Sequence, residues 1–457
     1  MTTAAVTPAA PPATRFDRRL IAPMILGAVL NPINSSMIAV ALIPIGIALG
    51  APPSDTAWLV SGLYLATAVG QPVVGRLVDT YGPRRLYLIG GVLVGAAGLV
   101  GTLSPDLWVL VVARVLLGLG TCAGYPAAMY LIRGSGADSP AGVLTALAVS
   151  AQTISVVGPT LGGLLIGAGG WRTIFAVNIP LAVACLVLGA RRLPRTPLPQ
   201  TRVRVDLLGI ALFTVLLTTL LLVLMRPAHW YLLPITVLAG AALAVRELRT
   251  AEPFLDLRVF GGNLPLLATY GRNLLSYVIA YGFIYGFTQW LEAGRGLSAS
   301  VTGLVLLPTF VAAMVVSTLT GRRAAVRGKL VVGSVVQVAA ALLLLTVGSH
   351  SGFWLLGAAA LVAGVPQGLN GLANQSALYH QADPARIGAS AGLLRTFMYL
   401  GAIVAAAANG SFFADGADTA GLHRLALFLL VVAVLLLVAT VADRTLRQIG
   451  TTKGSPS

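Results

Sequence analysis

Charged side chains are scarce in this chain of 457 residues, at 10% of the total, whereas hydrophobic residues make up 57%. Soluble domains carry about 25% charged residues, and a chain with so few would expose large apolar patches to water. A lipid bilayer tolerates this composition. We therefore expect an integral membrane protein, and the sequence indicates no soluble domain of any size.

Cysteine, histidine and acidic residues are also few, at 2, 4 and 14. Cys122 and Cys185 fall inside apolar runs, which predicts two buried thiols and no disulfide framework. The histidines lie in or near loops without metal-ligand spacing, so we expect neither a metal site nor a cofactor. The chain also lacks HExxH, Walker and Ser/His/Asp patterns, which argues against an enzyme.

Basic residues outnumber acidic ones by 30 to 14, for a net charge of +16. Such an excess can indicate a nucleic-acid partner. Here the basic residues lie in short loops between long apolar runs, which is how membrane proteins fix their orientation. We therefore expect the charge to serve a lipid bilayer and no nucleic acid.

Spanning helices need roughly 20 apolar residues, and fourteen such runs follow one another along the chain. Their grouping as six, two and six predicts an all-α membrane protein with two six-helix bundles and an inserted helix pair. The expected helices are 20–49, 56–78, 85–104, 107–132, 142–168, 172–190, 207–225, 229–246, 264–291, 299–320, 329–348, 353–379, 387–413 and 424–442.

The chain divides into parts at its polar segments. Residues 191–206 are rich in arginine and proline and are typical of a linker between bundles. The expected parts are a cytoplasmic tail at 1–19, an N-terminal six-helix bundle at 20–190, a cytoplasmic linker at 191–205, an inserted transmembrane helix pair at 206–247, a C-terminal six-helix bundle at 264–443 and a cytoplasmic tail at 444–457.

Two residue types give independent tests of this topology. With both termini in the cytoplasm, 23 of the 30 basic residues fall in cytoplasmic segments and four fall outside. This asymmetry is what the positive-inside rule demands. Indole rings prefer the membrane interface, and all six tryptophans fall at helix ends on the arginine-poor side: Trp58, Trp108, Trp171, Trp230, Trp290 and Trp354.

The stretch GRLVDTYGPRR at residues 75–85 follows the second helix. It resembles the signature loop of the major facilitator superfamily, and the resemblance implies a gating role for this loop. Gly75 lets a neighbouring helix approach, Gly82 permits a tight turn, and Asp79 can make charge-assisted contacts with nearby arginines. The candidate gating residues here are Gly75, Asp79, Gly82, Arg84 and Arg85.

Two further motifs fit the same superfamily. The sequence RVLLGLG at 114–120 is similar to its second motif, an intramembrane arginine followed by closely packed glycines. The sequence GPTLGG at 158–163 resembles the motif of the exporting antiporter branch. Gly158 and Gly162 form a GxxxG face for helix contact and Pro159 can bend the helix, so these three are also gating candidates.

Three more stretches point to one branch of the superfamily. WRTIFAVNIP at 171–180 is similar to a stretch of drug exporters, while DLLG at 206–209 and EPFLDLRVF at 252–260 resemble the fourteen-helix drug:proton antiporters. The resemblance implies a monomeric secondary active transporter in the plasma (inner) membrane. It would export small amphipathic, drug-like molecules by alternating access with proton coupling. The alternative is an exporter or importer of one metabolite, such as an organic acid, sugar or natural product, without conventional proton coupling.

In this fold the helices at 20–49, 107–132, 264–291 and 353–379 would line the substrate cavity. Polar groups in a membrane are costly and usually face protein or water. The equal alternative for each of them is a hydrogen bond to a neighbouring helix with no substrate role. The candidate substrate-binding residues are Asn31, Asn34, Arg114, Arg272, Asn273, Tyr277, Tyr281, Gln367, Asn370 and Asn374.

The first helix departs from the exporter pattern. Drug exporters carry an aspartate where this chain has the stretch that begins at Asn31 and includes Asn34, and asparagine cannot carry a proton. Glu292 is the best candidate for proton coupling, because it follows apolar residues that would desolvate it. Asp55 is the second candidate, with helix capping as its alternative role.

Three arginines, Arg114, Arg272 and Arg395, fall inside the expected helices. The sequence shows no acidic residue near any of them, and each has backbone carbonyls as an alternative partner. Together they disfavour a lipophilic cation as substrate. We expect a neutral or anionic amphipathic molecule instead.

Overall fold

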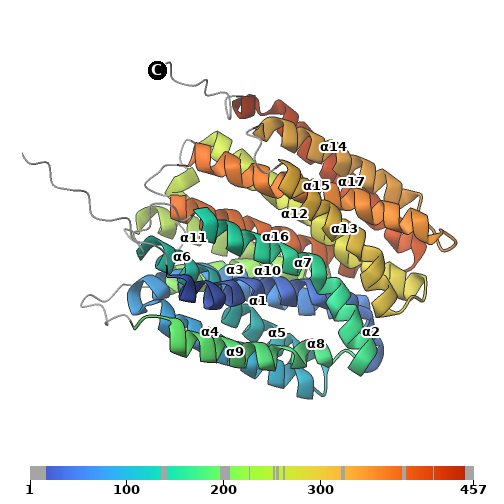
Figure 1. The fold of residues 1–457 in the computed structure, drawn as a ribbon. Coiled ribbons are helices and arrows are strands. Elements are labelled where there is room, and N and C mark those ends of the chain that lie inside the picture. The colour runs from blue at the N-terminus through green and yellow to red at the C-terminus, as the bar shows by residue number, and fades with distance from the viewer. Residues whose placement is uncertain are drawn as a thin grey trace, which may run out of the picture.

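The computed structural model describes residues 17–134, 141–195, 206–225, 227–250, 253, 257–260, 263–320, 325–382, 387–414 and 416–447, and within these the side chains of a few helical residues lie outside the description. Its helices run roughly parallel to one another, as Figure 1 shows. Most of the predicted tails at 1–19 and 444–457, most of the linker at 191–205, and residues 252 and 254–256 of the stretch 252–260 lie outside the described residues.

Helices occupy all fourteen predicted positions. The first is interrupted, since α1 (Ile21–Met37) continues through a short 3₁₀ segment into α2 (Leu42–Leu49). The others are α3 (Pro53–Tyr81), α4 (Pro83–Leu103), α5 (Leu107–Thr121), α6 (Gly124–Gly134), α7 (Ala141–Gly169), α8 (Thr173–Ala176), α9 (Asn178–Arg192), α10 (Leu207–Met225), α11 (Leu233–Arg249), α12 (Leu264–Gln289), α13 (Ala299–Thr320), α14 (Val326–Leu345), α15 (Phe353–Gln381), α16 (Ile387–Phe412) and α17 (Thr419–Ala442).

Twelve helical segments of the described chain are long and apolar enough to cross a membrane. The predicted number of fourteen is therefore not supported by this criterion. The two remaining positions are α12, whose polar side chains lower its hydropathy, and α7, in whose described part Val157–Gly169 forms an apolar helix below the required length. The protein is an all-helical, multi-pass membrane protein.

The two ends of the helix array differ in their side chains. The arginine end, as we call it, carries Arg18, Arg85, Arg192, Arg249 and Arg444. The tryptophan end carries Trp58, Trp108, Trp230 and Trp354 together with Trp171 and Trp290.

Two of the six tryptophans do not serve as lipid-facing anchors, contrary to the prediction. Trp290 is fully buried, stacks on Phe287 and donates its indole N–H to Thr419. Trp171 is 6% exposed and packs edge-on against Phe175. Both indole rings therefore pack inside the protein near the tryptophan end, where protein side chains surround them in place of lipid.

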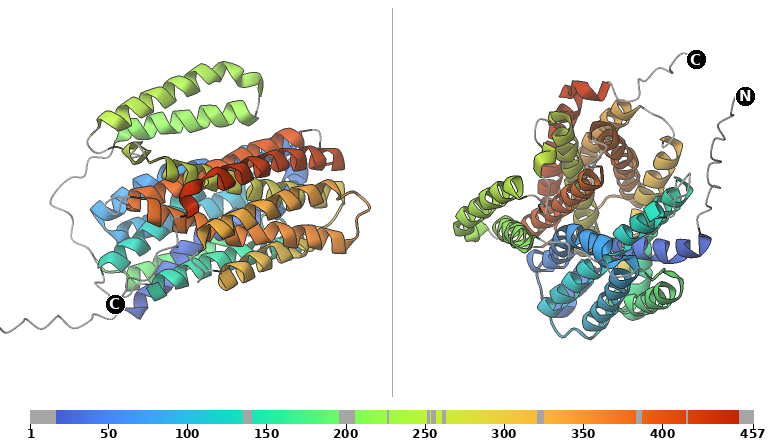
Figure 2. Two further views of the ribbon diagram at one scale, coloured as in Figure 1. Left: turned by 90° about the horizontal axis from the view of Figure 1, so that it is seen from above. Right: turned by 90° about the vertical axis from the view of Figure 1, so that its left-hand side faces the viewer.

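The helices form an N-terminal half, α1–α9, and a C-terminal half, α12–α17, which Figure 2 shows as blue-green and orange groups. Within the halves α3 packs on α5, α4 on α9, α14 on α15 and α17, and α12 on α16 and α17. The halves meet along two seams. At one α7 packs on α13, and at the other α3 packs on α16.

The inserted pair, α10 and α11, forms a hairpin on the side of the molecule (Figure 2). Its helix α10 packs on both α3 and α16. The hairpin therefore covers the α3–α16 seam, whereas it leaves the α7–α13 seam uncovered.

Glycines allow the closest helix contacts, as the motifs predict. A Cβ atom added at Gly118 of α5 would lie 2.6 Å from the Leu63 carbonyl oxygen of α3. A Cβ atom added at Gly368 of α15 would lie 2.5 Å from the Ala313 carbonyl oxygen of α13. Gly162 of α7 likewise faces the backbone of Met37. Gly75 is different, because nothing lies within 4 Å of the position its Cβ would take. The prediction that Gly75 admits a neighbouring helix is wrong for this conformation.

The turn between α3 and α4 is made by Gly82, whose φ of 85° is open to glycine and strained for other residues. This confirms the predicted tight turn. Arg84 then donates to the Ala190 carbonyl of α9 at 2.7 Å, and Arg85 is exposed. Asp79 lies in α3, and its side chain falls outside the description.

Candidate functional site

Three tyrosines form a ladder on one face of α12. Tyr277, Tyr281 and Tyr285 are four residues apart, a spacing that places them above one another on a helix. The rings of Tyr277 and Tyr281 stack at 5.8 Å between centroids, and those of Tyr281 and Tyr285 at 5.6 Å. Tyr277 and Tyr281 are half-buried, whereas Tyr285 is 1% exposed.

The ladder meets two tyrosines from other helices at the α3–α16 seam. Tyr64 of α3 packs edge-on against Tyr281 at 5.3 Å and lies 5.8 Å from the ring of Tyr399 on α16. The hydroxyl oxygens of Tyr64 and Tyr285 lie 3.2 Å apart. These five residues, which we call the tyrosine cluster, come from both halves of the protein.

Polar contacts extend the cluster toward the arginine end. The Tyr399 hydroxyl donates to Oε1 of Gln71 on α3 at 2.7 Å. The Arg395 guanidinium, one turn earlier on α16, lies 3.7 Å from the centre of the Tyr125 ring on α6. Both contacts join the two halves. Only Tyr277 and Tyr281 of this group were predicted from the sequence as site residues. Tyr285 shares their i, i+4 spacing on α12, whereas Tyr64 and Tyr399 become their neighbours only through the fold.

Arg114 and Asn34 belong to a network inside the N-terminal half. Arg114 donates to the carbonyls of Leu59 at 2.8 Å and Asn34 at 3.0 Å. The Asn34 side chain donates to the Leu30 carbonyl and to Oδ1 of Asn178 at 2.7 Å. All its named side chains are at most 3% exposed, so the network ties α1, α3, α5 and α9 together. Asn31 is half-buried and donates to Thr121 at 3.1 Å.

Arg272 has an acidic partner, contrary to the expectation from the sequence. Its Nη1 lies 2.5 Å from Oδ2 of Asp443, which follows α17, and its Nη2 donates to Thr269. Burial acts to raise the pKa of Asp443. Hydrogen bonds from Thr445 and Arg272, with the charge of Arg272, outweigh this and hold the pKa below its usual value. Arg272 thus stabilises the arginine end of the C-terminal half.

The neighbouring Asn273 donates to the Leu394 carbonyl of α16 at 2.9 Å and is 3% exposed. It therefore joins two helices of the C-terminal half. The structure brings neither Asn273 nor Arg272 to the tyrosine cluster.

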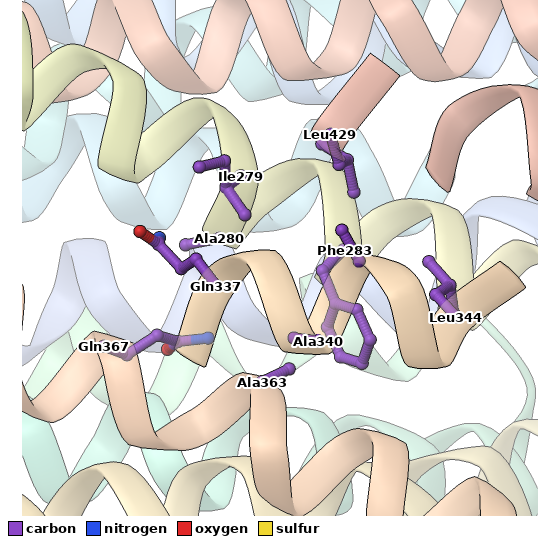
Figure 3. A pocket seen from close by; sticks show the side chains of 10 residues that line it. Ile279, Ala280, Phe283, Gln337, Ala340, Leu344, Ala363, Gln367 and Leu429 are labelled. Carbon is purple, nitrogen blue, oxygen red and sulfur yellow. The ribbon is translucent and has the colours of Figure 1, made fainter. Parts of the chain in front are cut away.

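One amide of α15, that of Gln367, lines an internal cavity of the C-terminal half. Figure 3 shows Gln367 and Gln337 beside this cavity, together with apolar side chains such as Phe283. Its volume of about 20 Å³ is enough for roughly one water molecule. Asn370 donates to Gln337 at 3.0 Å, and both side-chain polar atoms of fully buried Asn374 lack a protein partner. We find these amides inside one half rather than between the two.

The two acidic candidates lie near the tryptophan end. Glu292 is 7% exposed in a π-helical turn, Trp290–Gly294, that ends α12, and its Oε1 has no hydrogen-bond partner. Such π-turns are frequent at functional sites. Asp55 lies in the first turn of α3, while the N-cap is Pro52. A carboxylate there stabilises the helix dipole, so capping in the strict sense is not its role.

A second acidic site was not predicted from the sequence. Asp206 forms an ion pair with Arg246 at 2.7 Å, and Glu247, one residue on, is fully buried in the last turn of α11. Both carboxylates approach Gly209. They link the ends of the α10–α11 hairpin. Asp206 and Arg246 are 40 residues apart, so their pairing could not be recognised from sequence spacing.

The motif at 158–163 builds the α7–α13 seam. Thr160 donates to the Gly303 carbonyl at 3.0 Å, and Ser300 donates to the Gly163 carbonyl at 2.7 Å. Gly158 and Pro159 are buried, with Gly158 against Ser36 of α1. The halves are therefore held together near the tryptophan end by reciprocal bonds between glycine-rich helix faces.

Both cysteines are free and buried, as predicted. Within the described residues no group of three or more His, Cys, Asp or Glu side chains is placed to hold a metal ion.

Comparison with known sequences identifies several relatives. The profile of the Major Facilitator Superfamily matches residues 24–406. The uncharacterized MFS-type transporter YwoD of Bacillus subtilis is 32% identical over 85% of this chain and 88% of that protein. The multidrug efflux pump LfrA of Mycolicibacterium smegmatis is 30% identical over 88% of this chain and 82% of that protein. The tetracenomycin C resistance and export protein of Streptomyces glaucescens is 28% identical over 85% of this chain and 74% of that protein.

Solved structures of transporters share the fold. A peptide transporter, POT, superposes with a TM-score of 0.68 at 15% identity, over 94% of this chain and 96% of that one. A bacterial homologue of the lysosomal transporter Spinster gives a TM-score of 0.66 at 15% identity, over 98% of this chain and 100% of that one. The family match across most of the chain, with this fold, shows that the protein is a transporter that belongs to the major facilitator superfamily.

Proposed function

We propose that this protein is a secondary active exporter of small amphipathic organic molecules and that it works by alternating access. One observation carries the proposal. The tyrosine cluster is built from α3 of one half and α12 and α16 of the other, and two of its rings are half-buried. Aromatic faces bind apolar parts of a ligand while hydroxyls bind polar parts. The names of two relatives, an efflux pump and an export protein, support the direction of transport.

The rocking bodies would be the two predicted bundles, 20–190 and 264–443, with the hairpin at 206–247 beside them. We propose that α7 and α12 also cross the membrane, which completes fourteen spans. Support comes from their packing, because α7 lies against α1 and α13, and α12 lies against α16 and α17. A site between repeated bundles is the usual place for substrate in transporters that rock.

The arginine end would face the cytoplasm of a plasma membrane, with both termini inside, in keeping with the positive-inside rule. In that orientation the hydrogen-bonded α7–α13 seam closes the outer side. Gly158, Pro159 and Gly162 would then act as an outer gate. Gly82, Arg84 and Arg85, with Gly75 and Asp79, would act at the inner ends of α3 and α4. We propose a monomer.

Glu292 is the proposed proton carrier. It is a buried carboxylate at the end of the helix that carries the tyrosine ladder, so its protonation can respond to the same movement. Asp55 is the second candidate, at the same end of the neighbouring α3. The first helix offers no alternative, because Asn34 there cannot titrate.

The second candidate function is transport of one metabolite without conventional proton coupling. The observation that favours it is the absence of an acidic residue from α1 and α2, together with the hydrogen-bonded hydroxyls of Tyr64, Tyr285 and Tyr399. Hydroxyl and amide groups recognise one polar shape better than a range of lipophilic ones.

The deciding experiment uses the purified protein in proteoliposomes that enclose a pH-sensitive dye. A gradient is imposed, anionic, neutral and cationic amphiphiles are added, and proton movement and labelled substrate are recorded together. Glu292→Gln is compared with Asp106→Asn. Asp106 caps α5 at the same end, and asparagine caps a helix as well as aspartate does.

We expect proton movement that depends on substrate, is lost in Glu292→Gln and persists in Asp106→Asn. Substrate flux without proton movement would contradict proton coupling and favour the second candidate function. No flux of any amphiphile would contradict the proposed export itself.

A further inference from the structure

Three arginines, Arg114, Arg272 and Arg395, lie well inside the helices, away from the helix ends that carry most basic residues, and protein partners hold two of them. Arg272 pairs with Asp443. Arg114 is fully buried and donates to two backbone carbonyls. Arg395 differs from both. It is half-buried, lies beside the tyrosine cluster, and forms no ion pair with any carboxylate among the residues that the structure describes.

The known contact of Arg395 uses the face of its guanidinium. That group lies over the Tyr125 ring at 3.7 Å from the ring centre. A guanidinium is planar, and its five N–H donors point outward in that plane. Stacking on a ring therefore leaves the edge of the fork directed at acceptors in its plane. The Tyr399 hydroxyl is one such acceptor, and the remaining N–H donors of the edge stay available to a ligand.

The surroundings of Arg395 are aromatic. Tyr399 lies one turn further on α16, and Tyr277 of the α12 ladder lies within electrostatic reach of the guanidinium. Tyr277 and Tyr281 are both half-buried and stacked on one another. A planar apolar ring can add to this stack while an acidic group attached to it reaches Arg395.

A cation inside a membrane-spanning helix is costly and usually marks a function, and no carboxylate of the described residues pairs with Arg395. A carboxylate offers two oxygens that match the guanidinium fork in a charge-assisted, bidentate pair. A lipophilic cation would instead meet repulsion from Arg395. The charge, the remaining donors of the fork and the aromatic stack thus select the same ligand chemistry.

From these contacts we propose that Arg395 is the substrate-binding residue for the acidic group of an anionic aromatic amphiphile, with Tyr277 and Tyr281 as the platform for its ring. This inference rests on the proposed function and names its substrate class. Tyr125 comes from the N-terminal half and Arg395 from the C-terminal half, so the site changes when the halves rock. Its contacts, and with them its affinity, should therefore differ between the inward and outward states.

The test uses the full-length protein in nanodiscs and three probes that share one ring: 1-naphthylacetate, 1-naphthylacetamide and 1-naphthylmethylammonium. Binding is measured by equilibrium dialysis, and flux of the same probes is measured in proteoliposomes. Variants are Arg395→Gln, which removes the charge, and Arg395→Lys, which keeps it without the planar fork. Arg424→Gln is the matched control, because Arg424 is an exposed arginine at the tryptophan end.

We expect the wild-type protein to bind the carboxylate at least tenfold more tightly than the amide. Arg395→Gln should lose at least tenfold in carboxylate affinity and change amide affinity less than twofold. Arg395→Lys should fall between, and Arg424→Gln should match the wild type. Thermal unfolding of each variant shows whether a loss reflects unfolding, and an unchanged affinity ratio in folded Arg395→Gln overturns the assignment.

Failure of the inference and failure of the proposed function give different results. If the wild type carries the amide or the ammonium probe and does not prefer the carboxylate, the Arg395 assignment is wrong while export of amphiphiles stands. If it carries none of the three probes and no member of the wider amphiphile panel, both are wrong.

Discussion

Arg272 of α12 and Asp443 after α17 form a buried ion pair with 2.5 Å between Nη1 and Oδ2. The arginine side chain is fully buried and the aspartate side chain is 8% exposed. Thr445 donates to the other carboxylate oxygen from both its backbone N–H and its hydroxyl. The pair therefore fastens the end of the last helix to the helix that carries the tyrosine ladder.

The substitution Asp443→Asn should lower the free energy of unfolding by about 3 kcal/mol, since removal of one partner leaves a buried charge unpaired. Thermal unfolding in detergent measures this. The double variant Arg272→Gln with Asp443→Asn should recover part of the loss, because no unpaired charge remains. Equal stability of Asp443→Asn and wild type would show that solvent already screens the pair.

The same pair predicts a dependence of stability on pH. Because the pKa of Asp443 is lowered in the folded protein, its contribution is complete above the ordinary aspartate value of about 3.9. That contribution is lost as the pH falls through the folded pKa. The stability gap between wild type and Asp443→Asn should thus be constant from pH 6 to 8 and shrink below about pH 4. A gap that widens on acidification would contradict the assignment.

Tyr281→Ala should weaken substrate binding by roughly three- to tenfold, because each aromatic contact of this kind is worth about 0.5–1.5 kcal/mol. Tyr281→Phe keeps the ring and should stay within about twofold. The measurement is equilibrium binding of a labelled amphiphile to purified protein. If the alanine and phenylalanine variants bind alike, the ring is not a platform for substrate.

Asn34→Ala separates a structural role from a substrate role. It leaves Oδ1 of buried Asn178 without its donor, which should cost about 1–3 kcal/mol of stability. The KM for any transported substrate should stay unchanged. A raised KM with unchanged stability would instead return Asn34 to the substrate site proposed from its sequence position.

The sequence predicted the helix positions and the close glycine contacts well, because apolar runs and glycine spacing act locally. It could not place polar side chains that face inward within one half. Asn370, for example, donates to Gln337 on another helix, and Arg272 pairs with Asp443, which lies 171 residues further along the chain. The spacing of Asn370 and Asn374 shows that they share a helix face, and only packing decides which neighbour that face meets.

The tyrosine cluster also contains contacts between helices that the sequence alone could not predict. The i, i+4 spacing of Tyr277, Tyr281 and Tyr285 was visible in the sequence, whereas Tyr64 and Tyr399 join them only where α3 and α16 pack together. Aromatic residues are 7% of the chain, so their gathering at one junction is the signal that a search over helix faces would have found.

Gly303→Val tests the seam between α7 and α13. A Cβ at Gly303 would lie 2.7 Å from the Pro159 carbonyl oxygen and 3.1 Å from Cα of Thr160, so the helices must separate. We expect a shift toward the conformation open at the tryptophan end, measured as increased labelling of Thr160→Cys by a membrane-impermeant maleimide. Gly357→Val of α15 is the control, because nothing lies within 4 Å of its Cβ position, and it should leave labelling unchanged. Equal labelling in both variants would show that the seam does not govern access.

A disulfide across the same seam should lock the transporter. A Cβ at Gly167 would lie 4.0 Å from Cβ of Ser300, within the range of about 3.5–4.5 Å that disulfides need. The double variant Gly167→Cys with Ser300→Cys should form the bond on mild oxidation, lose transport, and regain it on reduction. The native Cys122 and Cys185 are buried and give little background, and each single variant is the control. Transport that continues with the disulfide formed would mean that α7 and α13 need not part at the tryptophan end, and alternating access through this seam would be wrong.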